Sequence, residues 1–98
     1  MKVFIYATLK SRHILEEALG EKHGKKLTPT TLNDWEESIS EKEWPTIDPV
    51  HIGEVKGDMI EVSAEELNKL DHWENNYRRI KVKTEIGSAW AYQWRGNQ

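Results

Sequence analysis

The sequence predicts an α+β fold, with a mostly antiparallel, curved β-sheet and two short helices. Segments with strand character and segments with helical character follow in the order strand, helix, a possible strand, strand, helix, strand, strand. Few connections are long enough for the crossover that parallel strands need. The chain has 98 residues, enough for one hydrophobic core and too few for two. We therefore expect residues 1–98 to form a single domain.

The first predicted strand, Lys2–Ala7, is apolar on both sides. Val3 and Ile5 point to one face, and Phe4 and Tyr6 point to the other, because side chains alternate along a strand. A strand buried on both faces is typical of the centre of a sheet.

A turn is expected at Thr8–Ser11, followed by a short amphipathic helix that Gly20 ends. The apolar residues that mark this helix are Ile14, Leu15, Ala18 and Leu19.

The middle of the chain is harder to interpret. Gly24–Asn33 is compatible with a strand, although Pro29 would restrict it to an edge of the sheet. The acidic stretch Asp34–Glu43 predicts an irregular excursion over the surface, and its charges are those of a solvated loop. The two prolines of Trp44–Pro49 predict a further loop.

From Ile52 to Val62 the pattern is again extended, and Gly53 and Gly57 indicate bends or a close approach of another backbone. Near the C-terminus, Tyr77–Ile86 alternates regularly, with one face formed by Ile80, Val82, Thr84 and Ile86.

A hairpin turn is expected at Gly87–Ser88, and Ala89–Trp94 then returns as the last strand. Trp90 and Trp94 lie on one face of this strand, where we expect them to fill the core rather than hold a ligand.

The second predicted helix places a charge where a leucine would be expected. Ser63 followed by Glu66 forms a capping box, which fixes the start of the helix. Leu67, Leu70 and Glu74 then point in one direction, at spacings of three and four residues. That direction is inward, since the other residues of the segment are polar. A carboxylate on a core face is costly to bury, so Glu74 is either paired or chemically active.

Composition excludes several classes of function. The chain has no cysteine, so a thiolate nucleophile and a cysteine-based metal site are impossible. A net charge of −3 argues against nucleic-acid binding, and no stretch approaches the ~20 apolar residues that span a bilayer. The four histidines show no ligand-like spacing, so neither a metal nor another cofactor is expected. These features suit a cytoplasmic protein, and the oligomeric state is not predicted.

Five segments, in order along the chain, resemble the γ-glutamylcyclotransferase-like (AIG2-like) proteins. The N-terminal VFIYATLK is similar to that family's VFVYGTLR, and WPTI is similar to its YPAI element. The other matching segments are Ile52–Gly57, Leu67–Arg79 and Ala89–Tyr92. The resemblance covers most of the chain except about residues 20–43. It implies a small closed β-barrel flanked by helices.

The resemblance also implies a reaction. Enzymes of this family cyclise a γ-glutamyl group: its free α-amine attacks the γ-carbonyl, which releases an amine or amino acid and 5-oxoproline. The resemblance makes Glu74 the general acid/base, a role that needs a pKa above that of free glutamate. The substrate-binding residues that it implies are Tyr6, Ala7, Thr8, Leu9, Tyr77 and Arg79.

Two alternatives stay open at this point. Glu74 could be a structural carboxylate bonded to Tyr77 or to a backbone N–H, and Asp71 is expected to be structural. Ala7 replaces the family's glycine, and with positive φ an alanine costs on the order of 1 kcal/mol. This departure favours a second hypothesis, a non-catalytic family member that binds a small anionic metabolite or a protein partner in the same cavity.

Overall fold

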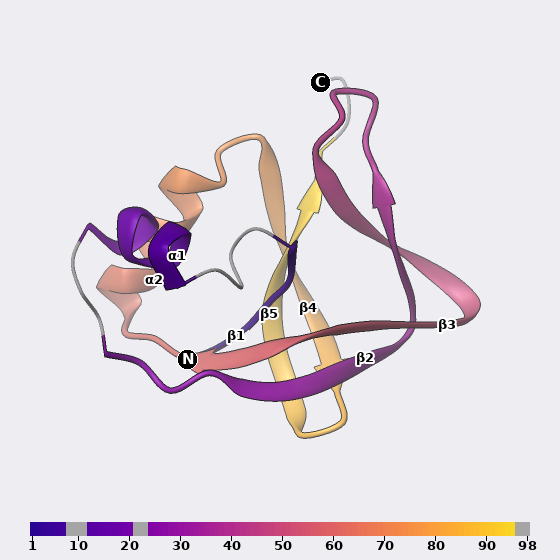
Figure 1. Cartoon of the computed structure of the whole chain (residues 1–98), viewed down its shortest axis with the longest axis horizontal. Helices are drawn as coiled ribbons and strands as arrows, with labels where there is room; N and C mark the ends of the chain where they lie inside the picture. Colours follow the sequence, from indigo (N-terminus) through magenta and orange to yellow (C-terminus); the bar gives the residue numbers. More distant parts are fainter. Residues whose placement is uncertain (8–11, 21–23, 96–98) are drawn as a thin grey trace.

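A computed structural model describes residues 1–7, 12–20 and 24–95 of the chain. In these residues it contains two helices and five strands (Figure 1). In chain order they are β1 (Lys2–Ile5), α1 (Arg12–Leu19), β2 (Thr28–Ile39), β3 (Pro45–Glu61), α2 (Ala64–Trp73), β4 (Tyr77–Thr84) and β5 (Gly87–Trp94). The predicted α+β class is confirmed. The expected turn at residues 8–11 lies outside the described residues.

The five strands form one mixed sheet in the order β2-β3-β1-β5-β4. The pairs β2–β3, β1–β3 and β4–β5 are antiparallel, whereas β1 pairs with β5 in parallel, with Val3 opposite Trp90. The prediction of a mostly antiparallel sheet is therefore only partly right. The central position predicted for the first strand is confirmed, since β1 lies between β3 and β5.

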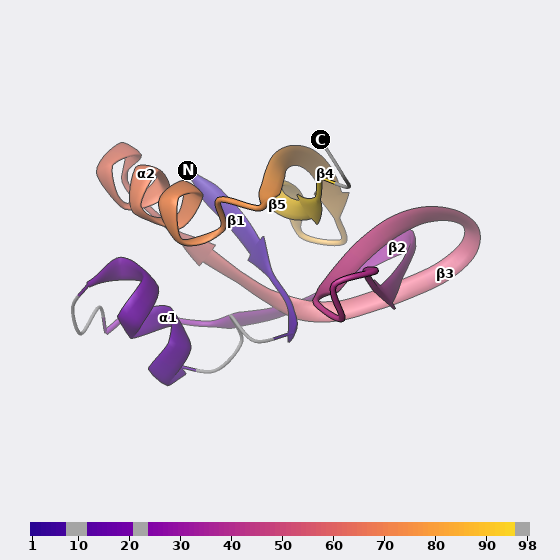
Figure 2. The same cartoon turned by 90° about the horizontal axis from the view of Figure 1, so that it is seen from above.

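The two faces of β1 belong to different hydrophobic cores. Val3 and Ile5 pack under the helices, in a cluster that includes Leu15 of α1 and Leu70 of α2. Phe4 and Tyr6 pack on the opposite face, in a cluster with residues from all the other strands. Figures 1 and 2 show both helices on one side of the molecule, with the long β2–β3 hairpin bent round on the other. The second core therefore fills the hollow of a curled sheet.

The closed barrel implied by the family resemblance is wrong, because the described strands form an open sheet with β2 and β4 at its edges. The edges meet at one end, where the backbone N–H of Glu85 donates to the carbonyl of Thr31 over 3.1 Å. Beyond this point the register of β2 shifts between Asn33 and Trp35, and Asp34 has a φ of 69°. Such an irregularity bends a strand, and we infer that it turns β2 away from β4.

The long hairpin corrects two further expectations. Residues Asp34–Ile39 belong to β2, not to an irregular excursion. Of these, Trp35–Ile39 pair with Pro45–Pro49, which form the start of β3 and not a loop. Carboxylates on a strand are compatible with pairing when they face water, and Glu36 and Glu37 are exposed. The prolines are tolerated because Pro45 is the first residue of its strand and Pro49 lies beside the register shift. The edge position of β2, predicted from Pro29, is confirmed.

The last hairpin turns two residues earlier than predicted. Thr84 pairs with Gly87, so Glu85 and Ile86 form the turn, and Ile86 is exposed instead of facing the core. The Thr84 hydroxyl explains the position: it accepts from the Ile86 N–H over 3.2 Å and donates to the Gly87 carbonyl over 2.8 Å. A hydroxyl that bonds the local backbone in this way stabilises a turn.

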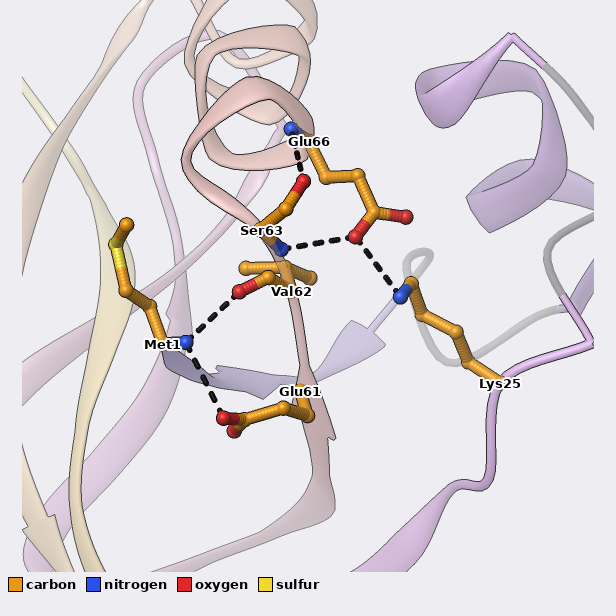
Figure 3. Close-up of polar contacts among 6 residues, drawn as sticks. All are labelled: Met1, Lys25, Glu61, Val62, Ser63 and Glu66. Carbon is orange, nitrogen blue, oxygen red and sulfur yellow. Dashed lines mark hydrogen bonds and ion pairs between the residues drawn. The ribbon is translucent and has the colours of Figure 1, made fainter.

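Both helices lie where the sequence places them. Gly20 follows α1 with a φ of 77°, as expected for a helix-ending glycine. At the start of α2, Ser63 accepts from the Glu66 N–H, and the Glu66 carboxylate accepts from the Ser63 N–H, which confirms the capping box (Figure 3). Lys25 forms an ion pair with Glu66 over 2.9 Å. These contacts fix the first turn of α2 and hence the direction in which its last turn points.

Candidate active site

Glu74 lies at the C-cap of α2, where its N–H donates to the Leu70 carbonyl over 2.8 Å. It is half-buried and lines a cavity of about 30 Å³. The other described residues of this cavity come from β1 and its end, from β3, and from the C-terminal hairpin. They are Phe4, Ile5, Tyr6, Ala7, Pro45, Tyr77 and Tyr92. The structure therefore brings Glu74 together with Tyr6, Ala7 and Tyr77, as predicted.

Burial raises the pKa of Glu74 from its ordinary value of 4.5 to about 7. Removal from water disfavours the charged carboxylate, and a cation or a hydrogen-bond donor would oppose that effect. Within the described part of the chain, no ion pair or hydrogen bond reaches the Glu74 carboxylate. The raised pKa is the condition that a glutamate needs to accept and return a proton near neutral pH.

Three tyrosines surround the cavity, and each donates its hydroxyl proton to an acceptor other than Glu74. The Tyr6 hydroxyl donates to the Tyr92 carbonyl, and the Tyr92 hydroxyl donates to Asp71 Oδ1 over 2.6 Å. The Tyr77 hydroxyl donates to the Pro45 carbonyl over 2.6 Å. The alternative in which Tyr77 neutralises a structural Glu74 is therefore wrong. A backbone N–H as partner is not found among the described residues.

The charge of the Glu74 carboxylate also affects the pKa values of the tyrosine phenols. Burial, followed by the charges of Tyr77 and Glu74, raises the pKa of the Tyr6 phenol above its usual range. Burial and then Glu74 raise the pKa of Tyr77 to about 12. Burial, followed by the hydrogen bond to Asp71, also raises the pKa of the Tyr92 phenol above its usual range. All three phenols consequently stay protonated at neutral pH, so they act in the cavity walls as hydrogen-bond donors and do not compete with Glu74 for a proton.

The start of β3 is held over the cavity by contacts with the C-terminal hairpin. Besides the bond from Tyr77 to Pro45, the Trp94 N–H donates to Thr46 Oγ1 over 2.8 Å, and Gln93 Nε2 donates to the Ile47 carbonyl over 3.1 Å. The Trp94 ring also packs edge-on against Tyr77, with the ring centroids 5.7 Å apart. These contacts explain how Pro45, which is distant from Glu74 in the sequence, becomes part of the cavity wall.

Ala7 adopts a left-handed conformation, with a φ of 53°. Alanine is disfavoured there because its Cβ approaches the following carbonyl oxygen. The residue is partly buried and packs against the second core. The positive φ that would make the replacement of glycine costly is thus present. Thr8 and Leu9, the other predicted residues of this loop, lie outside the described residues.

Arg79 lies beside the cavity and is not among the described residues that line it. Its guanidinium forms an ion pair with Asp71 over 3.3 Å and stacks over the Trp90 ring at 4.6 Å from the centroid. Asp71 therefore has the structural contacts that were expected of it. Its partners are Arg79 and Tyr92.

The sequence interpretation missed several cavity residues, of which Tyr92 and Pro45 are the most informative. The alternation of β5 placed Tyr92 on one face with two tryptophans, and this pattern suggested core packing. Pro45 was assigned to a loop. Its place at the cavity depends on the curl of the β2–β3 hairpin, which no local signal encodes.

Two further classes of site are absent from residues 1–7, 12–20 and 24–95. No group of three or more histidine, aspartate or glutamate side chains there could hold a metal ion. No helix in that part of the chain is long and apolar enough to cross a membrane.

The fold and this cavity define a small α+β protein with a glutamate in the wall of a tyrosine-lined pocket, and among the described residues this glutamate has no side-chain partner. A family model described as "Gamma-glutamyl cyclotransferase, AIG2-like" matches residues 3–98. The chain therefore belongs to the AIG2-like gamma-glutamyl cyclotransferase family. No curated protein sequence matches the chain significantly.

Solved structures share the fold at low sequence identity. A protein from Arabidopsis thaliana has a TM-score of 0.81 and 24% identity, covering 99% of this chain and 70% of that chain. A gamma-glutamyl cyclotransferase has a TM-score of 0.76 and 17% identity, and the match covers 100% of this chain and 68% of that chain. An AIG2-like protein from Mus musculus has a TM-score of 0.74 and 20% identity, and the match covers 99% of this chain and 78% of that chain. At these identities the likeness establishes the fold.

Proposed function

We propose that the protein is a γ-glutamyl cyclotransferase that uses Glu74 as its general acid/base. The observation that carries this proposal is the Glu74 carboxylate itself, buried in a cavity wall without a described partner and with a pKa of about 7. A structural carboxylate would be stabilised by a partner, and all three neighbouring phenols donate elsewhere. Membership of the family supplies the reaction class.

In the proposed reaction the ionised Glu74 removes a proton from the α-ammonium of the γ-glutamyl group. The freed amine attacks the γ-carbonyl carbon of the same molecule and forms the new C–N bond of 5-oxoproline. The original amide C–N bond then breaks, and protonated Glu74 returns its proton to the leaving nitrogen. The ring closes within one substrate, so the protein mainly has to hold the chain in an attack geometry.

Turnover by a Glu74→Gln variant tests this proposal. Glutamine keeps the shape of the side chain and cannot accept the proton, so we expect 5-oxoproline release to fall by at least about 100-fold. The substrates are a γ-glutamyl alkylamine and a γ-glutamyl amino acid, and 5-oxoproline is measured by chromatography. In the wild type, kcat/KM should rise with pH on an acid limb near pH 7, because the reaction starts from the carboxylate.

The matched control is Glu54→Gln, which removes an exposed carboxylate of β3 outside the cavity. It should retain wild-type turnover. If Glu74→Gln turns over as fast as the wild type, Glu74 is not the acid/base and the proposal is wrong.

A second candidate is a non-catalytic member of the family that binds a small anionic metabolite or a protein partner in this cavity. The left-handed φ of Ala7, where the similar sequences have glycine, favours it. This candidate predicts that the wild type binds a carboxylate-bearing ligand and releases no 5-oxoproline from either substrate. Turnover of either substrate would exclude it.

A further inference from the structure

Three phenolic hydroxyls surround Glu74, and the acceptors that hold them are of two kinds. Tyr6 and Tyr77 donate to backbone carbonyls, which every residue type supplies. Tyr92 donates to a side chain, Asp71 Oδ1, over 2.6 Å. The bond between Tyr92 and Asp71 therefore depends on the identity of a residue that is not among the described residues of the cavity wall.

Asp71 lies three residues before Glu74, near the end of α2. Side chains at this spacing are neighbours on a helix surface, with about 5–6 Å between their Cβ atoms. Glu74 keeps its helical position, since its N–H donates to the Leu70 carbonyl over 2.8 Å. Tyr92 itself lines the Glu74 cavity, which has a volume of only about 30 Å³. The Tyr92 hydroxyl is thus a donor close to two carboxylates, and it is bonded to Asp71.

Both partners of this hydrogen bond are held in place. Asp71 Oδ2 lies 3.3 Å from an Arg79 nitrogen, and the Arg79 guanidinium stacks over the Trp90 ring at 4.6 Å from the centroid. The backbone of Tyr92 is fixed as well, because its carbonyl accepts the Tyr6 hydroxyl proton. The Tyr92 hydroxyl therefore keeps one orientation, with its proton directed at Asp71.

The other described groups around Glu74 offer it neither a charge nor a side-chain donor. Arg79 is engaged by Asp71 and is not among the described residues that line the cavity. Within the described cavity wall, the phenols are therefore the side chains that could donate to Glu74. The remaining described wall residues do not titrate, and they are Phe4, Ile5, Ala7 and Pro45.

We infer that Asp71 is a positioning residue for the proposed acid/base: it accepts the Tyr92 hydroxyl proton and so withholds this donor from Glu74. The inference rests on the proposed function. Tyr92 is buried, and buried polar groups take the partners within their reach, so a hydroxyl released from Asp71 would donate to Glu74. A hydrogen bond to the ionised carboxylate favours that form and lowers its pKa. Asp71 thereby preserves the raised pKa that general acid/base chemistry requires.

Titration of the Glu74 carboxyl group tests this inference without turnover, by NMR of protein labelled at its glutamate carboxyl carbons. The Glu74 signal is assigned by its absence from Glu74→Gln. Asp71→Leu keeps the branched shape and removes the acceptor, so the pKa of Glu74 should fall by about one pH unit, as expected of one hydrogen bond to a carboxylate. The matched control, Asp71→Asn, removes the same charge and keeps an oxygen acceptor, so Glu74 should titrate as in the wild type.

Two variants of Tyr92 separate this mechanism from a general disturbance of the wall. In Tyr92→Phe the pKa of Glu74 should stay at about 7, because the missing hydroxyl donates to Asp71 in the wild type. When Asp71→Leu is combined with Tyr92→Phe there is no released donor, so the wild-type pKa should return. A released Arg79 guanidinium would instead lower the pKa of Glu74 in both proteins that carry Asp71→Leu.

The pH dependence of turnover gives a second measurement. With a γ-glutamyl substrate, the acid limb of kcat/KM should lie about one pH unit lower in Asp71→Leu and should not move in Asp71→Asn. Thermal unfolding checks that each variant is folded, and Asp71→Ala repeats the test should Asp71→Leu be unfolded.

An unchanged Glu74 titration in folded Asp71→Leu overturns the inference, as does a shift that persists in the double variant or one that occurs in Tyr92→Phe alone. None of these results affects the cyclotransferase proposal. Absence of turnover in the wild type contradicts the proposed function instead, and the NMR titrations then decide by themselves whether Asp71 controls the donor beside Glu74.

Discussion

Replacement of Glu74 by glutamine should stabilise the protein, and the gain should depend on pH. The folded protein keeps Glu74 protonated up to a pKa of about 7, whereas an unfolded chain releases the same proton at its ordinary pKa of 4.5. Between these values the folded state binds more protons than the unfolded state. The free energy of unfolding therefore falls as the pH rises through this window.

The size of the effect follows from the two pKa values. A tenfold change in proton affinity corresponds to about 1.4 kcal/mol, so a carboxyl with a pKa of 4.5 unfolded and about 7 folded costs about 3.5 kcal/mol once it is ionised. Below pH 4.5 the cost is absent, and above pH 7 it is complete. Glutamine has no proton to lose. The difference in stability between variant and wild type should therefore grow from near zero at pH 4 to about 3.5 kcal/mol at pH 9.

Urea unfolding at a series of pH values measures this difference, with the fluorescence of the five tryptophans as the signal. Each pH needs the wild type, Glu74→Gln and Glu54→Gln in buffers of equal ionic strength. Glu54→Gln should run parallel to the wild type, because its carboxylate is exposed. If the Glu74→Gln curve also runs parallel, or if the wild type is the more stable protein at pH 9, the carboxylate has a partner and the reasoning is refuted.

Two backbone substitutions complete the predictions. Ala7→Gly removes left-handed strain of about 1 kcal/mol but adds about 0.4–1 kcal/mol of unfolded-chain entropy, so stability measured by urea unfolding should change little or rise. The control is Ala91→Gly at a buried position of β5, which should lower the free energy of unfolding by about 1 kcal/mol or more. An equal loss of stability in both variants would contradict the strain at Ala7. Gly57→Ala should cost at least about 2 kcal/mol, since its Cβ would lie 2.3 Å from the Ile5 carbonyl oxygen and 2.7 Å from the Phe4 ring. An unchanged melting temperature for this variant would contradict the close packing of β3 on β1.

The parts of the fold that were predicted correctly are those with a local signal. The two buried faces of β1, the capping box at Ser63 and Glu66, and the alternation in β4 each follow from the spacing of neighbouring residues. The long hairpin has no such signal. Residues Asp34–Ile39 look like a solvated loop until their pairing with β3 is known. The composition also gives no sign of the register shift and the positive φ at Asp34, where β2 bends.

The candidate site also contains residues that the sequence identified and residues that it did not. Glu74 was identified from helical spacing alone, and the family resemblance added Tyr6, Ala7 and Tyr77, all of which line the cavity. Tyr92 was missed because an alternating aromatic strand suits a core equally well. The resemblance also implied that Arg79 binds substrate, and strand alternation gives the face on which a long side chain lies but not its position on that face. The Arg79 guanidinium stacks on Trp90 and pairs with Asp71, and Arg79 is not among the described residues that line the cavity.

The different surroundings of two carboxylates on one helix support the assignment of roles. Asp71 and Glu74 are three residues apart, and the capping contacts at Ser63 and Glu66 fix the helix that carries both. Asp71 has a hydroxyl donor and a cation as partners, so its charge is compensated and it can hold the wall in place. Glu74 has neither among the described residues, and burial raises its pKa. When neighbouring carboxyl groups have such different environments, the unpaired one is suited to proton transfer and the paired one to positioning. A structural explanation of Glu74 would have to account for three tyrosine hydroxyls that all donate elsewhere.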